Sequence, residues 1–255
     1  MRIAWLLLCL PHVALAAPFL RTEGVATAAQ GAILYREVHW QRGADEGAER
    51  WVQYLCPDGS AFARKHMPAA TRPLARGYEL QDKRSGQNAN IQVTGRMVLI
   101  DWQEDAAATP RQKRLALPDN AVIDAGFDAA VRRHWPALMR GEKLNLPFLV
   151  PGRQRFYPIN VQHRGPVQWQ GMDAQSIEVS LGTWYGSVAP RLSLVYADAD
   201  RRLLEFRGTS NLLDPSNNYP QAVVRFPRSP SERRSIEWQQ AWAQPLVSKC
   251  SVNSK

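Results

Sequence analysis

The sequence is poor in cysteine, and long apolar runs are confined to its first residues. Three cysteines occur in 255 residues and none belongs to a Cys-x-x-Cys pair, which argues against a thioredoxin-like redox centre. After residue 16 no segment approaches the roughly 18 uncharged apolar residues that a membrane-spanning helix needs. Because 45% of the residues are apolar and 22% are charged, a disordered chain is excluded as well.

Recognisable catalytic motifs are also missing. The histidines are isolated, without a His-Glu-x-x-His helix or a Cys/His cluster, so the sequence predicts no zinc site. It contains no Gly-x-Ser-x-Gly elbow and no glycine-rich phosphate or dinucleotide loop. We therefore expect a protein that is not an enzyme, with no catalytic residue, no metal and no cofactor. An enzyme without a recognisable motif stays open, because 23 acidic residues always offer carboxylate pairs.

The first sixteen residues form a separate segment. Arg2 precedes a short apolar run over residues 3–10, and Ala14-Leu15-Ala16 is a small-x-small cleavage site. This pattern predicts a secretory signal over residues 1–16 and a periplasmic mature chain, with an uncleaved anchor as the alternative. The absence of an Asn-x-Ser/Thr acceptor after residue 16 favours a bacterial route over a eukaryotic one.

Two cysteines, Cys56 and Cys250, remain after that cleavage. In an oxidising compartment their pairing is the default, so we predict a Cys56–Cys250 disulfide, with two buried free thiols as the alternative. The chain is basic, with a formal net charge of +9. Its arginines form short scattered clusters typical of solvated faces, and outside the cytoplasm no nucleic acid is expected as a partner. Anionic lipid headgroups are the other class of partner for such a charge.

The dominant pattern is β. Runs of aromatic and β-branched residues alternate with short turn signals, as in Pro57-Asp58-Gly59, and few segments show helical periodicity. We predict a single mainly β domain over residues 17–255. It consists of an antiparallel meander that forms a curved sheet or half-barrel, with strands over 17–118 and 148–227, a central helix over 124–140 and a C-terminal helix over 229–243.

Both helices carry start signals. Asp124 is expected as the N-cap of the central helix, whose apolar stripe ends at Leu138 and whose Pro136 kinks it or begins a second turn. In the C-terminal helix, Ser229 and Glu232 fit the N-cap and N3 positions of a capping box. Trp238 and Trp242 then share one face of this helix, which favours packing on the sheet over ligand contact.

Two polar segments are interpreted as connections. His163-Arg164-Gly165-Pro166 resembles a hairpin turn between two strands. The segment from Ser210 to Pro220 is rich in Ser, Asn and Asp, which favours Asx and Ser/Thr turns. A calcium site there would need several converging oxygens, and Asp214 is the only charged residue of the segment.

The order of these elements and motifs resembles a known family. The Pro-Asp-Gly hairpin, Asp124-Ala125-Gly126-Phe127 at the start of a helix, Phe148-Leu149-Val150-Pro151 and Gly208-Thr209-Ser210-Asn211 together resemble an uncharacterised family of exported bacterial envelope proteins. That family is distantly similar to the outer-membrane lipoprotein carriers, which are half-barrels covered by helices that hold acyl chains in their concave face. The resemblance implies a half-barrel fold and no ligand residues.

Two functions remain open beside the enzyme. The first is a carrier or binding protein for a lipid or other amphipathic ligand, with an apolar pocket between the sheet and the 124–140 helix. Its expected lining is aromatic, and its expected headgroup contacts are arginines: Phe156, Trp169, Trp184, Arg153 and Arg155. The second is a structural or interaction module whose sheet face or edge meets another envelope protein. A continuous apolar cavity would favour the carrier, and a filled interior would favour the module.

Overall fold

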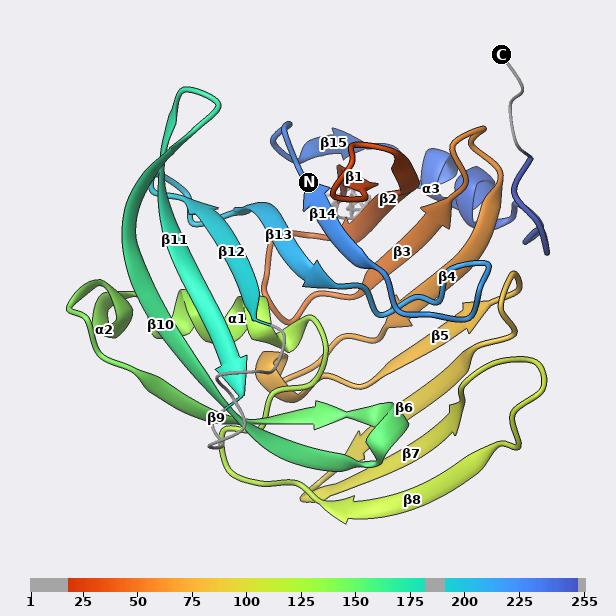
Figure 1. The fold of residues 1–255 in the computed structure, drawn as a ribbon, viewed down its shortest axis with the longest axis horizontal. Coiled ribbons are helices and arrows are strands. Elements are labelled where there is room, and N and C mark those ends of the chain that lie inside the picture. The colour runs from red at the N-terminus through yellow and green to blue at the C-terminus, as the bar shows by residue number, and fades with distance from the viewer. Residues whose placement is uncertain (1–17, 182–190, 252–255) are drawn as a thin grey trace, which may run out of the picture.

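The computed structural model describes residues 18–181 and 191–251, which form fifteen strands and three α-helices (Figure 1). Every strand pair within the sheet is antiparallel, and the strands form one open sheet in the order β8-β7-β6-β5-β4-β3-β2-β1-β14-β13-β12-β11-β10-β9. The strands are β1 (Phe19–Thr27), β2 (Ile33–Arg42), β3 (Arg50–Leu55), β4 (Ala61–Met67), β5 (Tyr78–Asp82), β6 (Asn88–Thr94), β7 (Met97–Gln103), β8 (Arg111–Ala116), β9 (Leu144–Val150), β10 (Arg155–Trp169), β11 (Met172–Leu181), β12 (Leu192–Ala197), β13 (Leu203–Thr209), β14 (Gln221–Arg225) and β15 (Ser231–Arg233). The expected antiparallel meander and curved half-barrel are confirmed.

The sheet consists of two meanders joined through β1. Residues Val25–Thr27 of β1 pair with β14, whereas Phe19–Arg21 pair with the short strand β15. The first strand of the chain therefore lies in the middle of the sheet, between its N-terminal and C-terminal halves (Figure 1).

The two faces of the sheet differ in what covers them. In β3, Val52 and Tyr54 point into the half-barrel and join its main core, while Trp51 and Gln53 point outward. The outward side chains lie under α3 (Ser235–Trp242), where Gln53 donates a hydrogen bond to the Ala241 carbonyl at 2.5 Å. Both faces of this strand are therefore buried.

The central helix is shorter and more broken than the sequence predicts. It consists of α1 (Gly126–Arg133) and α2 (Trp135–Met139), which are separated at His134. Pro136 therefore lies in the first turn of a second short helix, which was one of the two alternatives expected for it. The expected apolar stripe is buried, with Val131 and Leu138 fully inaccessible. Asp124 is not the N-cap, because its backbone is left-handed (φ 46°) and Ala125 precedes the helix.

The C-terminal helix begins later than expected. Ser231–Arg233 is the strand β15, so Glu232 pairs with Leu20 of β1 instead of capping a helix. The helix runs from Ser235 to Trp242, and the Glu237 carboxylate accepts a hydrogen bond from the Arg234 backbone N–H at 3.4 Å. A capping pair is therefore present, but it lies later in the chain than expected, because Ser231–Arg233 pair with β1 instead of starting the helix.

The predicted hairpin at His163-Arg164-Gly165-Pro166 is wrong. These residues lie inside β10, which runs without interruption over fifteen residues and pairs with β11 from Ile159 to Trp169. The register shifts between His163 and Gly165, and Gly165 has a φ of 118°. A glycine with a positive φ allows a β-bulge within a continuous strand, which gives the same residue pattern as a turn.

None of the described helices is long and apolar enough to cross a membrane. Residues 1–17, which include the predicted signal segment, lie outside the described residues.

Candidate functional site

The predicted disulfide is present. Cys56, at the end of β3, is bonded to Cys250, and their Cα atoms lie 5.4 Å apart across a sequence separation of 194 residues. Close to it, the Val247 N–H donates to the Ala61 carbonyl at 2.8 Å. The C-terminal segment after α3 is therefore fastened to the β3–β4 hairpin.

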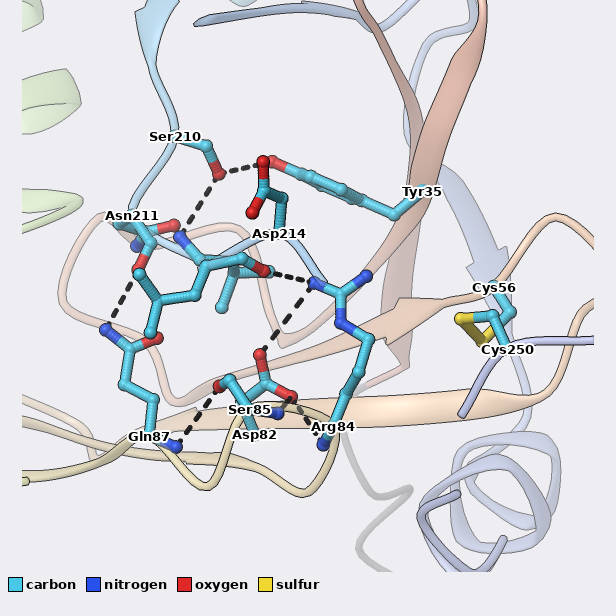
Figure 2. A network of polar contacts seen from close by, with 12 residues as sticks. Tyr35, Cys56, Asp82, Arg84, Ser85, Gln87, Ser210, Asn211, Asp214 and Cys250 are labelled. Atoms are coloured by element: carbon cyan, nitrogen blue, oxygen red, sulfur yellow. Dashed lines mark hydrogen bonds and ion pairs between the residues drawn. A yellow bond between two sulfur atoms is a disulfide. The ribbon is translucent and has the colours of Figure 1, made fainter. Parts of the chain in front are cut away.

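A largely buried polar network joins the β5–β6 turn to the segment that follows β13 (Figure 2). Asp82, at the end of β5, accepts hydrogen bonds from the backbone N–H groups of Arg84 (2.8 Å) and Ser85 (3.3 Å). Arg84 lies over the Phe62 ring, 4.0 Å from its centroid, and donates to the Leu213 carbonyl at 2.5 Å. The β5–β6 turn is thus tied to the distant segment that follows β13.

That distant segment is built from the expected turns. Ser210 Oγ lies 3.2 Å from the Tyr35 hydroxyl and accepts the Leu212 N–H at 3.1 Å. Asp214 Oδ1 accepts the N–H groups of Ser216 (2.8 Å) and Asn218 (2.9 Å). The Asx and Ser/Thr interpretation is confirmed, because these side chains satisfy the backbone of their own loop.

The interior also holds a buried ion pair. Lys65 of β4 donates to both carboxylate oxygens of Asp124, at 2.8 and 3.0 Å, and its ammonium lies 5.1 Å from the centroid of the Tyr78 ring. Asn211 donates to the same carboxylate at 3.5 Å. Asp124 thus connects β4 with the segment after β13 instead of capping α1.

The pair shifts the titration of both partners. Burial alone raises the pKa of Asp124, but the Lys65 ammonium and its hydrogen bonds outweigh burial and hold the pKa below its ordinary value. Burial alone lowers the pKa of Lys65, and the Asp124 carboxylate reverses that effect, so the pKa is raised. Burial is the main cause of the raised pKa values of Tyr54 and Tyr78 nearby.

Among the described residues, packed side chains occupy the space that was expected to form an apolar pocket. Between α1, α2 and the C-terminal meander, Val131, Leu138 and Trp135 pack against Val161, Ile177 and other strand side chains of one continuous core cluster. The cavity beside the start of α1 has a volume of about 10 Å³, room for about one water. Its lining includes Arg50, Arg76 and Glu46 beside apolar residues such as Met67 and Ile123, so it is not a purely apolar cavity.

The structure does not bring the sequence-predicted ligand residues together. Phe156 and Trp169 lie near opposite ends of the 15-residue strand β10, so roughly 40 Å of extended chain separates them. Phe156 packs on the main core, whereas Trp169 is buried in a small separate cluster and donates to Glu205 at 3.3 Å. Arg153 and Arg155 are exposed, and Trp184 lies outside the described residues.

Arg155 does make one aromatic contact, with its guanidinium carbon 5.3 Å from the centroid of the Tyr157 ring. Tyr157 is its neighbour along β10, so this contact is local to the strand. The four predicted residues that the structure describes therefore do not line one shared pocket.

Two open depressions lie on the outer surface. One, of about 710 Å³, lies beside α1 and is lined by arginines and acids, among them Arg132, which is ion-paired to Glu46 and Asp128 at 2.8 Å each. The other, of about 540 Å³, lies on the outer face of β4–β7 next to the end of α3. We call the second depression the outer groove. Its lining residues are Arg64, His66, Glu79, Leu80, Gln81, Asn88, Ala89, Asn90, Asp101, Trp102, Gln103, Pro110 and Trp242.

Sequence reasoning missed the outer groove because its polar residues look like the solvated face of separate strands. The only local signal was the alternation of polar and apolar residues along β5, β6 and β7, which predicts an outward polar face but not a hollow one. Among the described residues, no cluster of three or more His, Cys, Asp or Glu side chains is arranged to hold a metal ion.

Comparisons with known proteins identify the fold. No family model matches the chain, and no curated protein matches it. A beta-barrel-like protein of the domain of unknown function DUF1849 from Brucella abortus is similar in structure, with a TM-score of 0.54 and 7% identity over 86% of this chain and 99% of that chain. A putative outer membrane lipoprotein-sorting protein domain from Vibrio parahaemolyticus has a TM-score of 0.29 at 9% identity, with 88% of each chain covered. The half-barrel of this protein is thus the fold of the DUF1849 protein.

Proposed function

We propose that this protein is an exported, non-catalytic interaction module of the bacterial envelope that binds its partner on the outer face of the half-barrel. Export is supported by the Cys56–Cys250 disulfide, because such bonds persist in oxidising compartments and are rare in the cytosol. The signal segment inferred over residues 1–16 would direct the chain to the periplasm.

The observation that carries this proposal is the filled interior. A carrier of acyl chains needs a preformed apolar space, and small-molecule pockets typically measure about 300–1,000 Å³. Among the described residues, inward apolar side chains of both meanders belong to packed core clusters, and the cavity beside α1 has a volume of about 10 Å³. Of the two functions left open by the sequence, the interaction module is therefore the better supported.

The two sheet edges are poor binding surfaces. At the β8 edge, Lys113 lies opposite the fully buried Ile100 and so places a charge on the inner side of an exposed strand. Inward-pointing charges on an edge strand discourage pairing with another chain. The β9 edge is covered, because Val122 donates to the Pro147 carbonyl at 2.8 Å and accepts from the Leu149 N–H at 2.9 Å. A face of the sheet is therefore favoured over an edge.

We also propose that the protein is not an enzyme, because the buried groups with shifted pKa values that the structure describes do not face a site that could hold a substrate. Strongly shifted pKa values often mark catalytic groups. Here the shifted groups include Lys65, Asp124 and Tyr78, which bond or stack with one another. The cavity that Asp124 lines has a volume of about 10 Å³, which is too small for a substrate.

A titration separates the module from the carrier. Delipidated mature protein is titrated with fatty acids of increasing chain length and with anionic phospholipids, while its tryptophan fluorescence is followed. We expect no saturable change with either class of lipid. Saturable binding that tightens with chain length, by about 0.8 kcal/mol per buried methylene, would restore the carrier and refute the proposal.

A further inference from the structure

The floor of the outer groove consists of two rows of polar side chains that cross four strands. In the first row, Gln81 lies opposite Arg64 and Asn88, and Asn88 lies opposite Gln103. In the second row, Glu79 lies opposite His66 and Asn90, and Asn90 lies opposite Asp101. Because neighbouring strands are about 4.8 Å apart, each row is about 14 Å long. The groove is long enough for an extended ligand with several polar groups.

The chemistry of these rows fits a neutral ligand. Four of the eight side chains are amides, and an amide both donates and accepts hydrogen bonds. The charged members include one arginine and two carboxylates, so neither sign dominates. A polyanion would meet Glu79 and Asp101. Asn88 and Gln103 already donate hydrogen bonds within the protein. An acyl chain would offer no hydrogen-bond partner to the remaining amides, those of Gln81 and Asn90. Hydroxyl groups, which donate and accept as amides do, are the matching partners.

One wall of the groove is aromatic. Trp242, at the end of α3, lines the groove and also packs against the outer aromatic cluster of Phe19, Trp51 and their neighbours. The Arg64 guanidinium carbon lies 5.6 Å from the centroid of the Trp242 ring, and its Nε has no hydrogen-bond partner among the described residues. The Trp242 ring is therefore held in place from two sides, next to the polar floor.

We propose that the outer groove binds a neutral oligosaccharide. A sugar ring offers an apolar C–H face, which packs on an aromatic ring, and a rim of hydroxyls, which bond to amides and carboxylates. The groove supplies both surfaces side by side. This inference rests on the proposed function, since it takes the outer face of the half-barrel as the binding surface, and it assigns the groove on that face to a saccharide rather than to an envelope protein.

The test uses the full mature protein and an array of immobilised neutral oligosaccharides built from glucose, mannose, galactose and N-acetylglucosamine. We expect saturable binding to at least one class, which is then measured by titration calorimetry with the soluble oligomer. Asn90→Ala should weaken binding about tenfold, the effect of losing one or two hydrogen bonds to the ligand. Trp242→Ala should weaken it further, because the aromatic wall is lost.

The matched control is Gln92→Ala. Gln92 is exposed, lies two residues from Asn90 on the same strand and on the same face, and does not line the groove. Its substitution should leave the affinity unchanged. Asn90 makes no side-chain hydrogen bond with any described residue, so Asn90→Ala tests the groove without the packing loss that Trp242→Ala brings.

Three results would overturn the inference: an array without signal, binding that Asn90→Ala and Gln92→Ala weaken equally, or groove-dependent binding of a protein in place of a sugar. The lipid titration keeps this failure distinct from failure of the proposed function. If neither the array nor the lipid titration shows binding, the saccharide inference is refuted and the proposed outer-face module still stands. If fatty acids bind saturably, the proposed module itself is refuted.

Discussion

The buried pair of Lys65 and Asp124 gives the sharpest test of how this half-barrel is held together. The Lys65 side chain is 5% exposed, and its ammonium bonds to both Asp124 oxygens. Asp124→Ala leaves that ammonium buried without a hydrogen-bond acceptor among the described residues, with the Tyr78 ring 5.1 Å away. Removing one partner of a buried pair leaves a charge uncompensated, so we expect a loss of about 3–5 kcal/mol in the free energy of unfolding at pH 7.

The double variant Lys65→Met/Asp124→Leu is the control. Replacing both partners with apolar side chains of similar volume removes the buried charge, so its loss should be much smaller than that of Asp124→Ala. Urea unfolding followed by tryptophan fluorescence measures both. A double variant at least as unstable as the single one would refute the reasoning, because the cost would then come from packing rather than from charge.

At alkaline pH, the free energy of unfolding of the wild type and that of Asp124→Ala should change with pH in opposite directions. In the wild type the raised pKa of Lys65 contributes stability below the unfolded value, and this contribution is lost as the pH rises through the folded pKa. The lowered pKa of Asp124 contributes stability above its unfolded value, which is lost as the pH falls through the folded pKa. In Asp124→Ala, burial is left to lower the pKa of Lys65, so stability should rise toward alkaline pH.

Two further predictions concern the disulfide and the central helix. Because the bond closes a loop of 194 residues, Cys250→Ser should lower the free energy of unfolding by about 5 kcal/mol, and thiol labelling of the unfolded, unreduced wild type should modify neither Cys56 nor Cys250. Labelling of both would contradict the bond. Val131 is fully buried on α1, so Val131→Asp should lower the free energy of unfolding in urea by several kcal/mol. Arg133 is exposed on the same helix, so Arg133→Asp should change it by less than about 0.5 kcal/mol. Equal losses would show that the buried and exposed faces of α1 are assigned wrongly.

Strand alternation and turn chemistry were enough to predict the fold class. In β11, Ile177 and Val179 are buried as their alternation with polar residues indicates. The edge strand β8 lies within the region 17–118 that is expected to contain strands, but no local pattern marks it, because five of its six residues are exposed and its sequence has no apolar alternation. Along β10, Gly165-Pro166 was interpreted as a turn, since a bulge and a turn use the same residues and only the partner strand β11 distinguishes them.

Tertiary contacts decided what local signals could not. Asp124 precedes a helix, as an N-cap does, yet its carboxylate faces Lys65, which lies 59 positions earlier in the chain. The outer groove draws its lining from four strands, a helix and Pro110, and only the strand register brings Arg64, Gln81 and Gln103 into one row. No pattern within one segment predicts such a surface, so the candidate site could not be predicted from sequence alone.

Because β1 lies in the middle of the sheet, the sheet cannot be completed until strands from both ends of the chain have been made. Its neighbours β2 and β14 are reached at very different times during synthesis, because β2 follows it directly whereas β14 begins at Gln221. Until then one side of β1 has unpaired backbone N–H and C=O groups, which are a template for pairing with other chains. Long-range pairing of this kind is slow to form. A newly made chain is therefore open to aggregation until nearly all of it is available, and a chain truncated before Gln221 would keep that exposed edge.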